Sequence, residues 1–193
     1  MYKILFKNKI NLLFLLISFL CLINVVGIDN VSFKSTEWLY IGESSQHQLG
    51  WHFFKNDIWR FPLGSNPNYG GEFSNSIVFS DAIPILALFF KSLKSFIPGN
   101  FQYFSFWYFI CFFLQLFFSF KIIKKFTGSD LYSVIGSFFF LISPIFIYRV
   151  DEHVALASQW LLLFALYLGL TQKIDKAKSL WILLIILSSL INL

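Results

Sequence analysis

Two polar clusters interrupt an otherwise apolar chain, and they hold the side chains that could do chemistry. The first ends at Asp81, which follows the turn-rich stretch "FPLGSNPNYGGEF" and directly precedes an apolar run. The second is "RVDEH", residues 149–153, which lies between two long apolar runs. Carboxylates can act as general bases or bind a divalent cation, a histidine can carry a proton, and an arginine suits a phosphate. These clusters are therefore the first candidates for a functional site.

Each cluster also has a purely structural interpretation. Asp81 stands just before an apolar run, in the position of a residue that caps a helix N-terminus. Residues 149–153 have the composition of a tight, solvated turn between two membrane spans. Against this second interpretation, Arg149 directly follows an apolar run on the side that we assign to the outer face, where positive charge is disfavoured. A phosphate or an acidic partner would explain an arginine at that position.

The composition indicates a membrane protein. Of the 193 residues, 57% are hydrophobic and only 13% are charged, whereas about a quarter of the residues are charged in a soluble domain. We therefore predict an all-α polytopic membrane protein. The net charge of +5 does not indicate nucleic-acid binding, because the cations lie in short clusters between apolar runs, as the positive-inside rule favours. The two cysteines, Cys21 and Cys111, lie within apolar runs and have no metal-binding spacing.

Four apolar runs have about the length that a helix needs to cross a bilayer, and a fifth reaches the C-terminus. The five predicted spans are residues 10–28, 101–120, 131–148, 154–171 and 179–193. The first run is long and lacks a small-residue cleavage motif, so we expect a retained anchor rather than a signal peptide. The last run has no polar flank, so we expect residues 1–193 to be one membrane domain at the N-terminal part of a longer protein.

Residues 29–100 form the longest polar segment, and their position depends on whether residues 82–97 cross the membrane. The apolar core of 82–97 is only about half as long as a crossing, and Lys91 and Lys94 follow it at helical spacing. We predict an amphipathic helix that lies in the interface. With no crossing here, nine of the fifteen cations lie in three short inner segments, as the positive-inside rule favours. The N-terminus is then cytoplasmic, and 29–100 and 149–153 share the outer face.

The outer segment also contains the stretch "SSQHQLGWHFF", which predicts a short helix with His47 one turn before Trp51. The two histidines of this stretch are five residues apart, which is a poor spacing for a metal pair on one helix face. We therefore do not predict a metal site from them.

Five blocks of the chain resemble a known family. They are "YIGESSQHQLGWHFF", "WRFPLGSNPNYGGEF", "SIVFSDAIPILALFFK", "FQYFSFWYFICFFLQ" and "RVDEHVALASQWLLLFALYL", and together they cover roughly residues 37–170. The resemblance is to an uncharacterised family of bacterial multi-pass membrane proteins that is itself similar to the GT-C glycosyltransferases. It implies a GT-C-like helical bundle in the cytoplasmic (inner) membrane, with a long first external loop that carries interfacial helices.

The resemblance also implies which acids matter. GT-C enzymes use lipid-linked sugar donors at the outer membrane face and need an acid in the first external loop, often with a second acid in the next one. By this resemblance, Asp81 or Glu43 is the first acid, and Asp151 or Glu152 is the second. Asp81 lies in the closest-matching block, whereas Glu43 stands where the family leads us to expect an aspartate. We therefore prefer Asp81.

The implied reaction is inverting sugar transfer from a polyprenyl-phosphate donor. A carboxylate deprotonates or orients the acceptor hydroxyl, cations stabilise the departing phosphate, and aromatic rings contact the sugar. A divalent cation held by the carboxylates is a further expectation. The side chains predicted to bind substrate are Arg149, His153, Arg60, His47, Trp59 and Tyr69.

Two other classes of function fit a protein of this kind. A transporter or flippase would place ionisable groups within its spans, but the main polar residues there are Asn24, Gln115 and Gln159, and none of them ionises. A non-catalytic membrane subunit of envelope polysaccharide assembly would use the aromatic outer segment for protein contact.

Overall fold

In this computed structural model, residues 2–172 and 174–191 are described, with the backbone alone for 2–8, 151–152 and 174–175. All regular elements of the described residues are helices, which confirms the predicted all-α class. The α-helices are α1 (Tyr2–Val26), α2 (Ser44–Asn56), α3 (Pro84–Ser92), α4 (Phe104–Thr127), α5 (Asp130–Leu141), α6 (Pro144–Glu152), α7 (Trp160–Thr171) and α8 (Ile174–Ile191). Short 3-10 helices are η1 (Ile28–Asn30), η2 (Glu37–Tyr40), η3 (Gly71–Phe73), η4 (Ile77–Ser80), η5 (Lys94–Phe96) and η6 (Ala155–Ala157).

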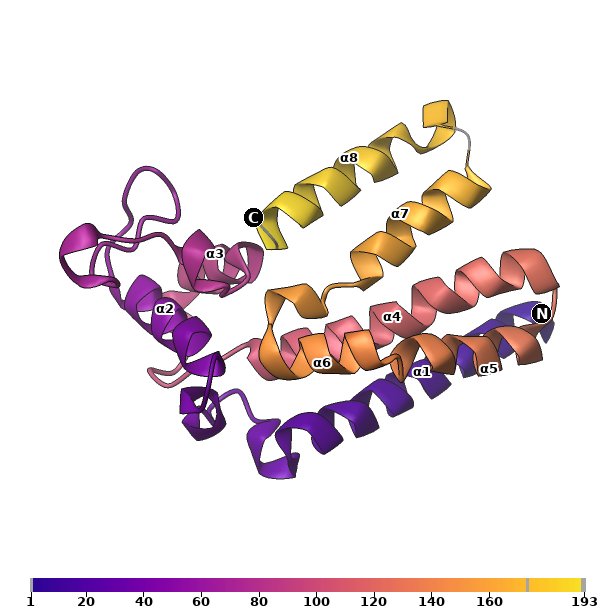
Figure 1. The fold of residues 1–193 in the computed structure, drawn as a ribbon, viewed down its shortest axis with the longest axis horizontal. Coiled ribbons are helices and arrows are strands. Elements are labelled where there is room, and N and C mark those ends of the chain that lie inside the picture. Colours follow the sequence, from indigo (N-terminus) through magenta and orange to yellow (C-terminus); the bar gives the residue numbers. More distant parts are fainter. Residues whose placement is uncertain (1, 173, 192–193) are drawn as a thin grey trace.

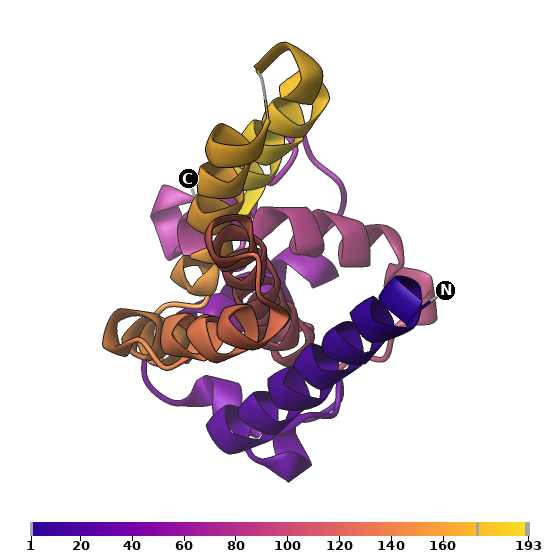
Figure 2. The same ribbon diagram turned by 90° about the vertical axis from the view of Figure 1, so that its right-hand side faces the viewer.

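The long helices form a bundle around α4, and the polar segment gathers at one end of it. Helices α1 and α7 pack against α4 and lie on different sides of it (Figure 1, Figure 2). The chain runs back and forth along the bundle, so α1, α6 and α8 end where α4 and α7 begin (Figure 1). Helices α2 and α3 lie at that same end (Figure 1).

Within residues 2–172 and 174–191, two helices are long and apolar enough to cross a membrane: α1, in its part Lys9–Val26, and α4. Helices α5 and α6 meet the same criterion only as a pair, which is bent by 54° at the break between them. The predicted single span 131–148 is therefore two helices. The break falls at Pro144, because proline has no amide hydrogen to donate to the preceding turn. Ser143 caps the new helix, and its Oγ accepts a hydrogen bond from the Phe146 amide at 3.3 Å.

The predicted span 154–171 is also interrupted. Helix α7 covers only the twelve residues Trp160–Thr171, which is fewer than the about 20 residues of a crossing helix. The residues before it form η6 and a short link, where the Val154 carbonyl accepts a hydrogen bond from the Trp107 indole instead of continuing a helix. Helix α8 begins earlier than predicted, at Ile174.

Aromatic side chains join the polar segment to the bundle. Trp51 of α2 is fully buried, and its indole N–H donates to the Phe101 carbonyl at 2.9 Å. The Tyr103 ring lies 5.0 Å from Trp51 and is stacked 5.4 Å from Phe90 of α3, between ring centroids. Helix α2, predicted from "SSQHQLGWHFF", is confirmed, and it is held rigidly over the start of α4.

Candidate functional site

A carboxylate–imidazole pair joins the two polar clusters. Glu43 Oε2 lies 3.1 Å from His153 Nδ1, with the side chains 55% and 31% exposed, respectively. Glu43 directly precedes α2, whose positive N-terminal end favours a carboxylate, and His153 directly follows α6. A pair this exposed contributes about 0–1 kcal/mol to stability. Its importance is that it brings the polar segment 29–100 and the "RVDEH" cluster together.

The His153 side of this pair is anchored to α4. The indole N–H of the buried Trp107 donates to the carbonyl of Val154, the next residue, at 2.7 Å. The His153 amide donates to the Arg149 carbonyl at 2.9 Å and closes the last turn of α6. The imidazole therefore sits on a fixed stretch of backbone at the end of the bundle.

The Glu43 side is fixed by the close packing of α2 on η4. His47, one turn after Glu43, is buried, and its Nδ1 donates to the Ser80 carbonyl at 3.0 Å. A carbonyl can only accept, so Nδ1 carries the proton. His47 Nε2 has no hydrogen-bond partner among the described residues. A Cβ at Gly50 would overlap the Ser80 side chain, which explains why a glycine stands inside this helix.

Asp81 follows η4 and so lies beside the same part of α2. It is not the predicted helix cap, because α3 begins at Pro84 and no side chain caps that end. Asp81 has a left-handed backbone with φ 53°, and its carboxylate makes no hydrogen bond or ion pair that involves the described residues. Ile83 is also left-handed, at φ 51°, which is unusual for a β-branched residue. The Tyr103 hydroxyl holds this segment by donating to the Ala82 carbonyl.

Residues 149–152 of the "RVDEH" cluster form the end of α6, and His153 follows in an extended conformation, so the cluster is not a tight turn. Arg149 lies in the last turn of α6, one turn before His153. Its guanidinium lies 5.8 Å from the Tyr148 ring centroid and forms no ion pair with the described side chains. The side chains of Asp151 and Glu152 lie outside the described residues, so their predicted roles stay predictions. Among the residues that are described, no group of three His, Cys, Asp or Glu side chains is arranged to hold a metal ion.

Tyr69, which was predicted to bind substrate, lies alongside α2. Its hydroxyl donates to the Gln46 carbonyl at 3.4 Å, and its ring lies 5.9 Å from that of Phe53. Burial raises the pKa of the Tyr69 phenol. The phenol therefore remains neutral and cannot serve as a base at neutral pH.

Arg60 and Trp59 lie beyond the other end of α2. Arg60 is engaged with Asp57, with Nε to Oδ2 at 2.8 Å and Nη2 to Oδ1 at 3.1 Å. The hydrogen bond from Arg60 lowers the pKa of the Asp57 carboxyl. Trp59 faces the Lys91 amine, 4.9 Å from its ring centroid. Because a thirteen-residue helix is about 20 Å long, the structure does not bring these residues together with Glu43.

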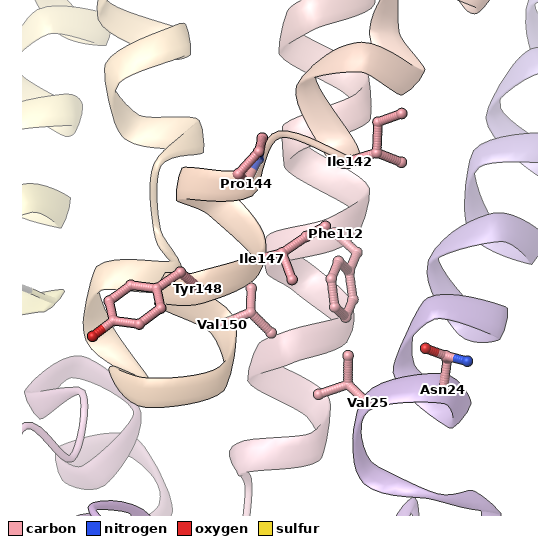
Figure 3. A pocket seen from close by; sticks show the side chains of 8 residues that line it. All are labelled: Asn24, Val25, Phe112, Ile142, Pro144, Ile147, Tyr148 and Val150. Carbon is pink, nitrogen blue, oxygen red and sulfur yellow. The ribbon is translucent and has the colours of Figure 1, made fainter.

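An apolar pocket of about 660 Å³ lies between α1, α4 and α6 (Figure 3). It is lined by Asn24, Val25, Phe112, Ile142, Pro144, Ile147, Tyr148 and Val150. The bend between α5 and α6 shapes one of its walls. Tyr148 borders Arg149 in sequence, so a chain-like apolar ligand in this pocket would reach towards the "RVDEH" cluster.

Sequence reasoning did not identify two residues that position the site. Trp107 lies within a continuous apolar run, where nothing distinguishes an indole that fixes a distant carbonyl. Gly50 did leave a signal, because a glycine inside a predicted helix suggests close approach of another backbone.

No curated protein and no solved structure matched the chain. A family model described as "Domain of unknown function (DUF6311)" matches residues 15–193, which is nearly the whole sequence. The chain therefore belongs to the DUF6311 family.

Proposed function

We propose that this chain is part of a GT-C-type membrane glycosyltransferase that takes a sugar from a polyprenyl-phosphate donor at the outer face of the cytoplasmic membrane. The observation that carries the proposal is the Glu43–His153 pair, a carboxylate in contact with an imidazole at the end of an apolar bundle.

A polytopic arrangement with a cytoplasmic N-terminus has support from charge. The start of α1, the end of α4 and the start of α8 lie at the bundle end opposite α2 (Figure 1). These three segments carry eight of the fifteen cations of the chain. By the positive-inside rule, that end is cytoplasmic and the Glu43–His153 end faces outward.

In the proposed mechanism, Glu43 orients His153 through Nδ1. A carboxylate at Nδ1 keeps the proton there and leaves Nε2 as the acceptor. Nε2 takes the proton of the acceptor hydroxyl, and the hydroxyl oxygen forms a bond to the anomeric carbon of the sugar. The bond from that carbon to the lipid phosphate breaks, and the phosphate leaves with the electron pair.

Arg149 is the proposed partner of the departing phosphate. It lies one turn before His153, and its guanidinium has no competing ion pair within the described part of the chain. A guanidinium can bind two phosphate oxygens at once. The apolar pocket between α1, α4 and α6 is the proposed place for the first isoprene units of the donor.

Between the two candidate acids of the outer segment, the geometry favours Glu43 over Asp81. Glu43 contacts a histidine that can accept a proton, whereas Asp81 contacts no ionisable group that the structure describes. We therefore assign the orienting role to Glu43 and give Asp81 no step in the proton transfer.

The test is sugar transfer from a radiolabelled polyprenyl-phosphate sugar in membranes that contain the chain. Removing a general base costs about 10²–10⁴-fold in rate, so we expect His153→Gln to lose transfer by that factor. Glu43→Gln should lose less, and the double variant should be no worse than His153→Gln because the two residues act as a unit. Asp130→Asn, an acid-to-amide change at the opposite end of the bundle, is the matched control. Unchanged transfer by His153→Gln at normal membrane level would refute the mechanism.

The transport alternative has less support. The described side chains buried in α1, α4, α5 and α7 are mainly apolar, with serines and Gln115 among the polar exceptions. Gln115 has a local role, because its amide donates to the Phe140 carbonyl of α5 at 3.4 Å. A coupled transporter needs ionisable groups at such depths.

A further inference from the structure

A second charged cluster surrounds the C-terminal end of α2, away from the Glu43–His153 pair. We call it the basic patch, and its members are Lys55, Arg60, Lys91, Lys94 and Asp57. The single carboxylate, Asp57, is held by Arg60 at 2.8 Å. The three lysines form no ion pair with the described side chains, so the patch has an excess of three positive charges.

Backbone carbonyls and aromatic rings hold the lysine amines in place. Lys91 Nζ donates to the Ile58 carbonyl at 3.1 Å and lies 3.9 Å from the Phe54 ring centroid. Lys94 Nζ donates to the Asn56 carbonyl at 3.3 Å. The Asn56 carbonyl lies at the C-terminus of α2, where carbonyls carry partial negative charge, and this offsets part of the repulsion between the cations. These neutral partners leave the positive charge of the patch uncompensated.

The same segments expose large apolar side chains. Phe61 is 94% exposed and Phe96 is 87% exposed, and Ile58, Trp59 and Leu63 are also exposed. Phe61 directly follows Arg60, and Phe96 lies two residues after Lys94. A large exposed apolar surface marks an interaction site. Aromatic rings interleaved with cations are typical of a surface that lies in the headgroup region of a bilayer.

We propose that the basic patch and its apolar rim dock onto anionic phospholipid headgroups of the bilayer in which α1 and α4 are embedded. Arg60 and Lys94, the exposed cations, contact lipid phosphates, while Phe61 and Phe96 enter the boundary between headgroups and acyl chains. A bilayer is the favoured partner because α4, which is long and apolar enough to cross a membrane, begins only eight residues after Phe96. The proposal needs membrane insertion but no transferase chemistry, so the two proposals can fail separately.

The test uses the full chain in vesicles, with Cys21 and Cys111 replaced by alanine. A donor dye is attached at Phe96→Cys, and resonance energy transfer from it to acceptor-labelled lipids is measured. Stronger transfer to labelled phosphatidylglycerol than to labelled phosphatidylcholine reports local enrichment of the anionic lipid. Each cation near an anionic surface contributes about fivefold to association. We expect a several-fold preference for phosphatidylglycerol, which Arg60→Gln/Lys94→Gln abolishes and high salt weakens.

The matched control is Lys125→Gln/Lys176→Gln, which removes two charges from the opposite end of the bundle and should leave the preference unchanged. Equal enrichment of the two lipids, or the same loss in the control, would overturn the proposal. A spin label at Phe96→Cys gives an independent readout, because it should be reached by oxygen more than by a water-soluble nickel complex. A label at Phe73→Cys, away from the patch, should show the reverse. Greater access of the nickel complex than of oxygen to the label at position 96, or spin–spin coupling between the labels of two copies of the chain, would also overturn the proposal.

Discussion

Replacing Gly50 by alanine should loosen α2 from η4 and so disturb the Glu43–His153 end of the molecule. A Cβ at this position would lie closer than 3.0 Å to both Cβ and Oγ of Ser80. Ser80 cannot swing away freely, because its hydroxyl donates to the Ile77 carbonyl and its own carbonyl accepts from His47.

The expected magnitude follows from three contributions. Overpacking costs about 1–3 kcal/mol, and losing the His47–Ser80 hydrogen bond adds about 1 kcal/mol. Alanine has a better helix propensity than glycine, which offsets about 1 kcal/mol of this loss. We therefore expect the free energy of unfolding of Gly50→Ala to fall by about 1–3 kcal/mol.

The assay is equilibrium unfolding in mixed detergent micelles, followed by tryptophan fluorescence. Gly169→Ala in α7 is the matched control, because no atom lies within 4 Å of its added Cβ, and it should be neutral or stabilising. Ser80→Gly removes the overlapping atoms, so Gly50→Ala should cost little in a Ser80→Gly background. The reasoning is refuted if Gly50→Ala is as stable as Gly169→Ala, or if Ser80→Gly rescues nothing.

Three further changes test other parts of the structure. Trp107→Phe removes the hydrogen bond to the Val154 carbonyl and should lower the free energy of unfolding by about 1–3 kcal/mol. The control is Trp181→Phe, because the Trp181 N–H has no partner among the described residues; this change should cost less than half as much. Burial lowers the pKa of Lys91 in the folded protein below its ordinary 10.5. At pH values between the folded-state pKa and 10.5, the unfolded chain therefore binds more protons than the folded one, and stability should rise with pH. Lys91→Met should flatten that rise in unfolding titrations, and an unchanged slope would contradict the burial of the amine. Asp81→Asn should leave the unfolding free energy within about 0.5 kcal/mol, and a larger loss would reveal a partner for this carboxylate.

That the two polar clusters lie at one end of the bundle could be predicted from the sequence, because the short apolar core of residues 82–97 and the distribution of cations both argued against a crossing there. The choice between Glu43 and Asp81 could not be predicted. It depends on how α2 sits on η4 and on where Trp107 holds the end of α6. Both are contacts between residues far apart in the sequence, and neither follows from local pattern.

The breaks in the predicted spans show a similar limit. Hydropathy identified the run 131–148 but not its division, although Pro144 was visible as a local signal. The prediction for Lys91 was wrong for another reason. Its spacing predicted a side chain on the polar face of the helix, but the amine points inward to the rings of Phe54 and Trp59. Cation–π contacts of this kind need rings from another segment, which periodicity cannot reveal.

The most direct test of the account is whether Glu43 and His153 meet at the outer face. In a chain without Cys21 and Cys111, Glu43→Cys and His153→Cys would be treated in spheroplasts with a short, membrane-impermeant thiol crosslinker. We expect rapid intramolecular crosslinking of this pair and none between Arg60→Cys and His153→Cys. If the 43–153 pair does not crosslink in sealed spheroplasts, or does so only after the membrane is opened, the proposed outer-face site is contradicted.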